Sequence, residues 1–302
     1  MNAYTSCMKR EKVVKKGKKA PITHWSHSSL MAFLRNPLAW HKRYVEQIYD
    51  NPSTPASFVG RAGHLALENF YKGASKELAI ERGLESLRNV ADFEIEFGKA
   101  KTKRAKREKR KSMEEEYHRA IGYYLARPPR HAVLGVEVSS VVEVEGLALP
   151  IKAISDLVVA SRVEKGAVDI VDHKFVAGFS KGGAAKPLFM IQAIFNYYTV
   201  HELFGKPVRR FIVYECKKTK NADGSPQMRR YEIDFRTCEE DFLVFHRLIN
   251  DATDEISRPR LYLPNPSDMF EGENSFDIYR LGLIGDNEEF TDREENGHAP
   301  GR

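Results

Sequence analysis

The sequence predicts an α/β fold with a mixed central sheet flanked by helices, in which the first half of the chain is mostly helical. Three observations lead to this expectation. Apolar residues follow a helical spacing up to about residue 130. From Ala132 onward they alternate with a period of two, which is typical of strands. A long apolar helix then separates three predicted strands from two more, an order that favours a sheet covered by helices.

The composition is that of a globular protein. Of the 302 residues, 42% are hydrophobic and 11% are aromatic, so the chain can bury a sizeable core. No segment approaches the roughly 18 consecutive apolar residues that a membrane helix needs. Three cysteines without a C-x-x-C spacing support neither a disulfide framework nor a cysteine metal site. We therefore expect a soluble cytoplasmic protein with no membrane attachment.

The chain is expected to begin with an arm that precedes the first helices. Residues 1–22 are rich in basic side chains and predict a flexible basic arm. Ser26 opens a helical pattern, with apolar residues at i, i+3 and i+4. Pro37 interrupts this pattern, which then resumes through Tyr44.

The clearest amphipathic helix spans Val59–Gly73. Its apolar stripe consists of Ala62, Leu65, Ala66 and Phe70, and Gly73 suits its C-terminal end. Another helix is expected over Lys76–Val90, and one more ends before Pro128. These segments complete the helical half of the chain.

Strands dominate the second half. Three are predicted in "AVLGVEVSSVVEVEG", "LALPIKAISDLVVA" and "AVDIVDHKF", which begin at Ala132, Leu147 and Ala167. A long helix from about Pro187 to Phe204 follows. The strands "RRFIVYECKK" and "MRRYEIDF" then flank a turn, and a helix over Glu239–Ile256 comes last.

These patterns predict three regions. We expect a basic arm over 1–22, a folded domain over 23–262 and an acidic, flexible tail over 263–302. Within the folded domain, the helical part covers 23–130 and the sheet core covers 131–262. The tail is expected to be flexible because Asp268–Arg302 holds ten acidic residues and three arginines.

Two basic runs account for the positive charge of the chain. Lys9–Lys19 carries seven basic residues and one acid, and Lys99–Lys111 carries nine and one. The rest of the chain has 32 basic and 40 acidic residues. Clustered cations favour DNA as a partner, because the phosphates that they neutralise release counterions. Alternatively, each run is a solvated arm or loop. The candidate DNA contacts are Lys99, Lys101, Lys103, Arg104, Lys106, Arg107, Lys109, Arg110 and Lys111.

The stretch "VDIVDHKF" places an acid and a base inside an apolar strand. Asp172 and Lys174 are two residues apart and share a face, whereas Val171 and His173 point the other way. Asp169 lies on the face opposite Asp172, so we leave it out of the site. A structural ion pair and a metal-dependent catalytic centre would both account for the pair.

A second carboxylate occurs in the preceding strand. Asp156 lies near the end of "IKAISDLVV", sixteen residues before Asp172. If the two strands are neighbours, both carboxylates and the Lys174 ammonium converge at one sheet edge. Paired carboxylates bind Mg²⁺, which also takes phosphate oxygens from a substrate. Lysine can orient or activate the attacking water and offset charge in the transition state. The set therefore predicts phosphodiester hydrolysis.

Two further polar residues have two interpretations each. Gln192 lies in an otherwise apolar helical segment, so it is either a core amide satisfied by the backbone or part of the site. His64 lies on the helix face away from the apolar stripe, which it shares with Arg61, Glu68 and Tyr71. It is either a solvated surface histidine or a neutral imidazole ligand of the same metal.

Taken in order, these motifs resemble the PD-(D/E)XK nuclease superfamily, specifically its RecB-like branch. The stretches are "SHSSLMAFLRNPLAWHKRYV", "GRAGHLALENFY", "GVEVSS", "ISDLVV", "VDHKF" and a Gln-containing apolar helix, between Ser26 and Phe204. The resemblance implies a restriction-endonuclease-like core and DNA cleavage that depends on Mg²⁺ or Mn²⁺. It also links the chain to CRISPR-adaptation and phage recombination exonucleases.

The resemblance assigns roles to individual residues by position. The metal ligands that it implies are His64, Asp156, Asp172 and the backbone carbonyl of His173. Lys174 would position the nucleophilic water, and Gln192 would steady the site or the DNA backbone. Glu137 is an auxiliary candidate because its match depends on where its strand begins. Tyr197 is a second auxiliary candidate.

The sequence departs from the branch at two informative positions. Asn36 stands where members often carry a cysteine, and no cysteine follows Cys238, so we expect no iron–sulfur cluster. Asn196 stands four residues after Gln192, where a tyrosine is usual. The tyrosines nearby are Tyr197 and Tyr198, so the sequence does not assign the role of that tyrosine.

The sequence thus predicts a metal-dependent DNA nuclease, an exonuclease rather than an endonuclease, in recombination, repair or phage genome processing. DNA and a recombination or single-strand-binding protein are the expected partners, and an oligomer is compatible with the sequence. One alternative is a non-cleaving DNA-binding or recombination accessory protein on the same fold, although a degenerate site would be expected to lack a motif residue. Another is a small-molecule metalloenzyme, which would leave the basic runs unexplained.

Overall fold

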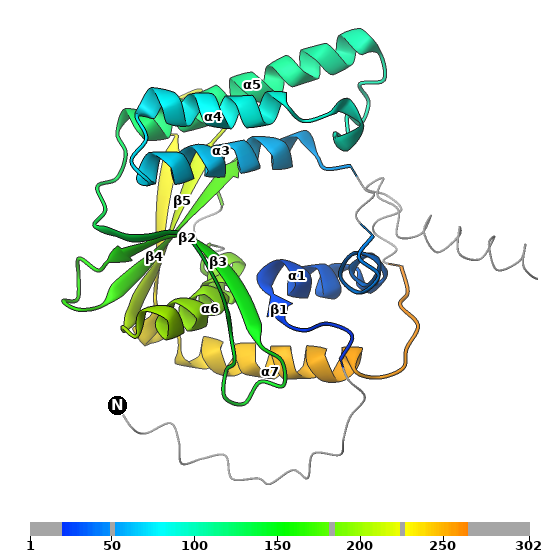
Figure 1. The fold of residues 1–302 in the computed structure, drawn as a ribbon, viewed down its shortest axis with the longest axis vertical. Coiled ribbons are helices and arrows are strands. Elements are labelled where there is room, and N and C mark those ends of the chain that lie inside the picture. Colours follow the sequence, from blue (N-terminus) through cyan, green and yellow to red (C-terminus); the bar gives the residue numbers. More distant parts are fainter. Residues whose placement is uncertain (1–19, 49–51, 181–184, 224–226, 265–302) are drawn as a thin grey trace, which may run out of the picture.

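The computed structural model describes residues 20–48, 52–180, 185–223 and 227–264 (Figure 1). The predicted basic arm up to residue 19 and the predicted acidic tail from residue 265 lie outside the described residues. Within the described ranges, the α/β prediction is confirmed. Seven α-helices flank a six-stranded mixed sheet.

The sheet is built around one strand that has three partners. Its strands are β1 (Trp25–Ser26), β2 (Val133–Val142), β3 (Ile151–Ala160), β4 (Val168–Val176), β5 (Val208–Lys217) and β6 (Met228–Asp234). The order is β1-β3-β4-β5-β6, and β2 pairs with β3 in addition. β1 pairs with β3 and β4 with β5 in parallel, whereas the other pairs are antiparallel. The short strand β1 was not expected from the sequence.

One edge of β3 is divided between two neighbours. β2 covers the other edge from Ile151 to Val159. The remaining edge therefore holds both β1, at Ile151 and Lys152, and β4, from Leu157 to Ala160. A short stretch of that edge pairs with neither strand. The sheet thus splits beside residues 153–156, and this split positions the site described below.

Helices cover the two faces of the sheet in two groups (Figure 1). One group consists of α3 (Pro55–Tyr71), α4 (Lys76–Arg88) and α5 (Lys103–Ala126). The other consists of α1 (His27–Arg35), α6 (Ala185–Phe204) and α7 (Glu239–Ile256), and α1 continues into α2 (Pro37–Trp40) and the π-helical turn His41–Val45. Each group encloses its own core against the sheet.

The two cores explain the alternation along the strands. Val158 and Ile170 belong to the core beneath α6, whereas Leu157 and Val171 belong to the core beneath α3 and α5. Large buried rings fill both, such as Phe195 on α6. Adjacent residues are therefore buried on opposite faces, which produces the continuous apolar runs of these strands.

The helix α3 packs more closely than its sequence pattern predicts. Its buried residues are Phe58, Val59, Ala62, Gly63, Ala66 and Leu67, whereas Leu65 and Phe70 of the predicted stripe are only partly buried. A Cβ atom at Gly63 would overlap the ring of Phe175 on β4. The missing side chain lets α3 lie close against β4, which brings the next residue, His64, to the sheet.

The second basic run is helical from Lys103 onward rather than a loop. Thr102 caps α5 by accepting a hydrogen bond from the N–H of Ala105 at 3.1 Å. Burial in α5 begins only at Met113. The basic half of α5 consequently projects past its packed half (Figure 1). Among the described helices, none is both long and apolar enough to span a membrane.

Candidate active site

The site lies where β3 and β4 stop pairing. Their last paired residues are Leu157 and Val171, and the next residue on each strand is an aspartate, Asp156 and Asp172. The backbone N–H of His173 donates to Oδ2 of Asp156 at 2.7 Å. A side-chain oxygen therefore takes the place that a strand carbonyl would fill. Both aspartates lie in the middle of their strands, so the expected location of Asp156 near a strand end is wrong.

The direction of the Asp156 side chain depends on an irregularity in β3. Ser155 faces α6, where its hydroxyl donates to Oδ1 of Asn196 at 2.6 Å. Leu157, two residues on, is buried on the opposite face beneath α3. Residues two apart normally share a face, so the alternation reverses at Asp156. Its carboxylate consequently turns toward α3.

The neighbouring strand β2 is irregular at the matching position. Val136 pairs with Leu157 and Val138 pairs with Ser155, but Glu137 between them has no partner in this ladder. Glu137 also has a φ angle of 50°, in the left-handed region that non-glycine residues rarely adopt. Backbone strain of this kind clusters at functional sites. Here it turns a second carboxylate toward α3.

Three side chains converge at this point. One ligand atom each from His64, Glu137 and Asp156 lie within 4.8 Å of one another. Nδ1 of His64 is 3.3 Å from Oδ2 of Asp156. Two carboxylates and an imidazole form a donor set that suits a divalent cation with oxygen and nitrogen ligands. The residues present therefore fit a metal site.

Opposing effects hold these groups in different charge states. Burial and the Asp156 carboxylate raise the pKa of Glu137 to about 7. Burial also disfavours ionisation of Asp156, but the imidazoles of His64 and His173 outweigh it and hold the pKa of Asp156 below its ordinary value. Burial would lower the pKa of His64, yet Asp156 outweighs this effect and raises the pKa. Such mutual perturbation is typical of functional sites.

The second aspartate has its own partners. Nε2 of Gln192 on α6 donates to Oδ1 of Asp172 at 2.7 Å, and Nζ of Lys174 lies 3.0 Å from Oδ2. Asp172 is 5% exposed. Burial raises the pKa of Asp172, Asp156 raises it further, and Lys174 opposes both. The predicted shared face of Asp172 and Lys174 is confirmed, and Gln192 is more than a core amide satisfied by backbone.

The side chain of His173 joins a buried hydrogen-bond chain that the sequence did not suggest. Its Nδ1 is 3.3 Å from Oδ2 of Asp156, and its Nε2 is 2.8 Å from the hydroxyl of Tyr124 on α5. The Tyr124 and Tyr71 hydroxyls are 2.6 Å apart. The Tyr71 hydroxyl also donates to the carbonyl oxygen of Pro129 at 3.5 Å. Buried contacts therefore connect the imidazole beside Asp156 to Tyr124 and Tyr71.

Most of the sequence-predicted site residues meet here. The structure brings together His64, Asp156, Asp172, the main chain of His173, Lys174 and Gln192, and it adds Glu137, which was only an auxiliary candidate. His64 is half-buried beside Asp156 and is not a freely solvated surface residue. Glu137 could be found from sequence only by the motif order, because nothing in its strand pattern marks the irregularity.

Two residues considered in the sequence analysis, Tyr197 and Asp169, lie outside this cluster. The ring of Tyr197 packs against Phe235 and Phe242, with centroids 4.9 Å from each, so it contacts the core under α7 instead of the site. Asp169 is 1% exposed and pairs with Arg210 at 2.6 Å, consistent with its exclusion from the site. Its role is structural.

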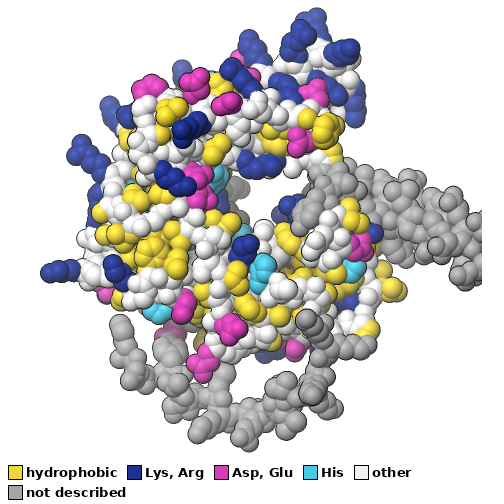
Figure 2. Space-filling view, in the orientation of Figure 1, with side chains coloured by type: hydrophobic (Ala, Val, Ile, Leu, Met, Phe, Trp, Pro, Cys, Tyr) yellow, Lys and Arg dark blue, Asp and Glu magenta, His cyan; other side chains and the backbone are white. Residues whose placement is uncertain are grey.

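Positive side chains gather on the projecting end of α5 (Figure 2). In the same view the surface is hollowed between the α3–α5 layer and the layer of α1 (Figure 2). Three cations of the run form ion pairs within the described part of the molecule: Arg104 with Glu108, Arg110 with Asp92 and Lys111 with Glu115. The other six make no ion pair among the described residues, and they are Lys99, Lys101, Lys103, Lys106, Arg107 and Lys109.

A comparison with protein families identifies the family of this chain. The family described as the PD-(D/E)XK nuclease superfamily matches residues 24–268, which is most of the chain. The chain belongs to this superfamily, whose members use divalent metals, and the family suggests a metal-dependent nuclease. A curated relative is not found. A solved structure titled "Crystal structure of SSO0001" is 17% identical, covering 76% of this chain and 84% of that chain with a TM-score of 0.27.

Proposed function

We propose that this protein is a metal-dependent DNA nuclease whose site is the cluster at the β3–β4 split. The observation that carries the proposal is the convergence of His64, Glu137 and Asp156 within 4.8 Å, on a chain of the nuclease superfamily. Asp172 and the backbone carbonyl of His173 are the further proposed ligands, and Mg²⁺ or Mn²⁺ is the proposed metal. We propose no iron–sulfur cluster.

The surrounding residues suit phosphodiester hydrolysis. A divalent metal bound there would polarise the scissile phosphate and lower the pKa of a bound water. Lys174, 3.0 Å from Asp172, would orient the attacking water and offset the charge that develops on the phosphate. Gln192 fixes Asp172 from the side of α6. His173 keeps Asp156 ionised and directed to the site.

Exonuclease activity is the finer proposal. It is supported by the order of motifs from Ser26 to Phe204, which resembles the RecB-like branch. Recombination, repair or phage genome processing is the proposed context. A recombination or single-strand-binding partner, an oligomeric state and a cytoplasmic location stay predictions from the sequence.

The exposed cations of the Lys99–Lys111 run are proposed to contact the DNA backbone. The run lies on the projecting end of α5 and the loop before it, where most of its basic side chains are exposed. The cations that form no ion pair with an acid of the described residues are available to neutralise phosphates of the DNA. We also propose that the nuclease domain covers 23–262, with the basic arm and the acidic tail as its flanks.

The test is cleavage of matched DNA substrates. Linear and covalently closed DNA, each single- and double-stranded, are incubated with Mg²⁺, Mn²⁺ or a chelator. We expect metal-dependent release of nucleotides from linear DNA. Covalently closed circles should stay intact, because an exonuclease needs a free end. Cleavage of closed circles would instead support an endonuclease. Binding without cleavage under every condition would favour the accessory-protein alternative.

Matched variants tie cleavage to the site. Asp172→Asn and Lys174→Ala should each lower the rate by about a hundredfold or more, while DNA binding persists. The controls are Asp254→Asn and Lys206→Ala, which change exposed residues of the same types. Undiminished cleavage by both site variants would remove this cluster from the mechanism.

A further inference from the structure

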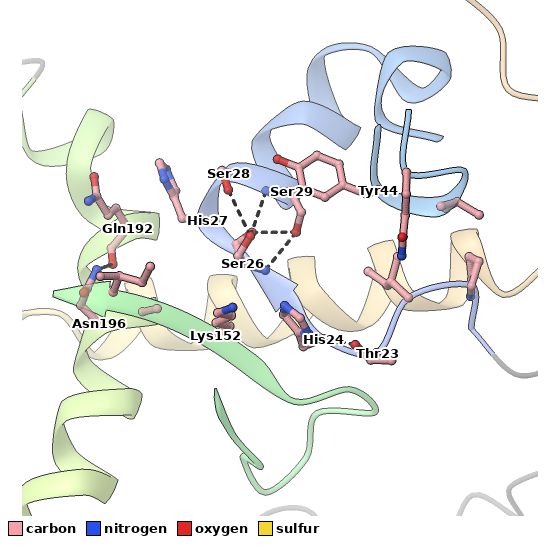
Figure 3. A pocket seen from close by; sticks show the side chains of 16 residues that line it. Thr23, His24, Ser26, His27, Ser28, Ser29, Tyr44, Lys152, Gln192 and Asn196 are labelled. Carbon is pink, nitrogen blue, oxygen red and sulfur yellow. Dashed lines mark hydrogen bonds between the residues drawn. The ribbon is translucent and has the colours of Figure 1, made fainter. Parts of the chain in front are cut away.

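A second cavity lies beside the proposed active site. It has a volume of about 580 Å³ and lies between residues 21–24, the first turn of α1, the turn His41–Val45 and the start of β3 (Figure 3). This volume is within the range of roughly 300–1,000 Å³ that is usual for small-ligand sites. The cavity is therefore large enough for a nucleotide-sized group.

The walls of this cavity carry no acid. None of the described residues that line it is Asp or Glu, although the chain has 42 acidic residues. Lys152 supplies an ammonium group that makes no ion pair in the described part of the chain. His24 lies next to it, with Nδ1 held by Thr23 Oγ1 at 2.9 Å, and the hydroxyl of Ser28 also lines the cavity. A cavity with these donors and no carboxylate is suited to an anion.

The proximity of Lys152 also affects the histidine. Burial lowers the pKa of His24, and the positive charge of Lys152 lowers it further. Figure 3 shows Lys152 between His24 and Asn196. Both side chains line the same cavity, so one bound group can lie against the ammonium and the imidazole. The neutral imidazole ring of His24 would donate a hydrogen bond to the bound group from Nε2 or accept one from that group.

Gln192 connects this cavity to the proposed active site. The residue lines the cavity, and its Nε2 donates to Asp172 at 2.7 Å. His27 lines the cavity near Gln192 (Figure 3), and burial together with the Lys174 charge lowers the pKa of His27 to about 4. A ligand in the cavity would therefore be separated from Asp172 of the proposed reaction centre by the side chain of Gln192.

We propose that this cavity binds a deoxynucleoside monophosphate unit and that Lys152 and His24 contact its phosphate. The inference rests on the proposed nuclease function and deepens it, because the unit is either the phosphorylated end of a DNA strand or the released mononucleotide. A cavity that holds an end beside the reaction centre would restrict cleavage to ends. The two sources share one chemistry, and binding experiments separate them.

The experiment measures binding without metal, so that no cleavage is needed. Fluorescence anisotropy compares labelled duplexes that carry a phosphate or a hydroxyl at the 5′ or the 3′ end, in the presence of a chelator. Unlabelled deoxynucleoside 5′- and 3′-monophosphates and a nucleoside serve as competitors. For the wild type we expect about tenfold tighter binding of one phosphorylated end, or competition by a monophosphate but not by the nucleoside.

Variants test which residues make the contact. Lys152→Gln should remove the preference for phosphate, and Lys152→Arg should retain it. His24→Ala should weaken it, whereas Lys206→Gln, an exposed control, should leave it unchanged. Thermal melting checks that each variant is folded, and His24→Ala provides the test if Lys152→Gln unfolds.

The outcomes separate this inference from the proposed function. Equal affinity for phosphate and hydroxyl ends, together with no competition by monophosphates, would overturn the inference, as would an unchanged preference in folded Lys152→Gln. Phosphate-dependent binding by a protein that never cleaves DNA would support the cavity and reject the nuclease. Cleavage of DNA without any preference for phosphate would support the nuclease and reject the proposed role of the cavity. Competition by a monophosphate without end preference would support the cavity as a product site.

Discussion

Oδ2 of Asp156 accepts the backbone N–H of His173 at 2.7 Å, where β3 and β4 have just stopped pairing. The same oxygen lies 3.3 Å from the imidazole Nδ1 of His173. One carboxylate thus lies against both the main chain and the imidazole of a single residue of the adjacent strand. The backbone hydrogen bond fixes the direction of the proposed metal ligand.

The hydrogen-bond chain behind His173 should control metal affinity. Tyr124→Phe removes the hydroxyl that contacts Nε2 of His173, so the ring beside Asp156 loses the partner that orients it. We expect the Mg²⁺ or Mn²⁺ concentration for half-maximal cleavage to rise about tenfold or more. Titration of cleavage with metal measures this shift.

Tyr123→Phe is the control for that experiment. Tyr123 is the adjacent residue on α5 and is 39% exposed. Its variant should leave the metal titration unchanged. Equal titrations for both phenylalanine variants would show that the contact between Tyr124 and His173 does not act on the site.

The acidity of Glu137 predicts a pH dependence of stability. Its pKa is raised from 4.5 to about 7, so the folded protein binds the proton more tightly than the unfolded chain does. The metal-free protein should therefore lose stability relative to Glu137→Gln as the pH rises from about 4.5 to about 7. Thermal melting of both proteins between pH 4.5 and pH 8 measures the difference.

Metal should reverse the trend, because a bound cation favours the ionised carboxylate. At pH 8, Mg²⁺ or Mn²⁺ should raise the Tm of the wild type more than that of Glu137→Gln. A difference in Tm between the two proteins that stays constant across the pH range would show that Glu137 does not titrate near pH 7.

Two glycines of the same helix should respond oppositely to alanine. At Gly63 a Cβ atom would overlap the Phe175 ring, so Gly63→Ala should destabilise by about 1–3 kcal/mol. At Gly60 a Cβ atom meets nothing within 4 Å, so Gly60→Ala should stabilise by about 0.5–1 kcal/mol. Urea unfolding measures both.

Gly63→Ala should also weaken cleavage, because His64 follows it and the displaced helix would carry the imidazole away from Asp156. Phe175→Leu combined with Gly63→Ala should recover part of the stability by removing the overlap. If Gly63→Ala were as stable as Gly60→Ala, the close approach of α3 to β4 would be disproved.

The basic end of α5 should set the salt dependence of DNA binding. Neutralising Lys103 and Arg107, which make no ion pair among the described residues, should flatten the slope of log affinity against log salt by up to about 0.9 per lost phosphate contact. Neutralising Arg104 and Lys111, which pair with acids, should change it less. Binding titrations at several salt concentrations give the slopes. The same slope for both pairs and the wild type would favour a solvated helix face.

Local pattern was sufficient to predict much of the architecture. The helix α7 begins and ends as expected at Glu239 and Ile256, because its apolar spacing and acidic first turn are local features. Likewise, the two-residue period placed Asp172 beside Lys174 without knowledge of any other strand. The motif order was sufficient to indicate the superfamily that the family comparison then showed.

Long-range contacts decided the rest. The Tyr124–His173 hydrogen bond joins residues 49 apart, and no local pattern connects them. The left-handed φ of Glu137 and the reversal at Asp156 break the alternation on which strand prediction depends.

The sequence by itself determined which elements form and which polar residues lie within them, because hydrophobic periodicity is a local property. Only the tertiary structure decided that β1 and β4 share one edge of β3, so that Asp156 lies at a gap in the sheet. It also placed Lys152 and Gln192 around one cavity whose described lining residues include no acid. Both results depend on strand pairing and helix packing between distant segments, which adjacent residues do not encode.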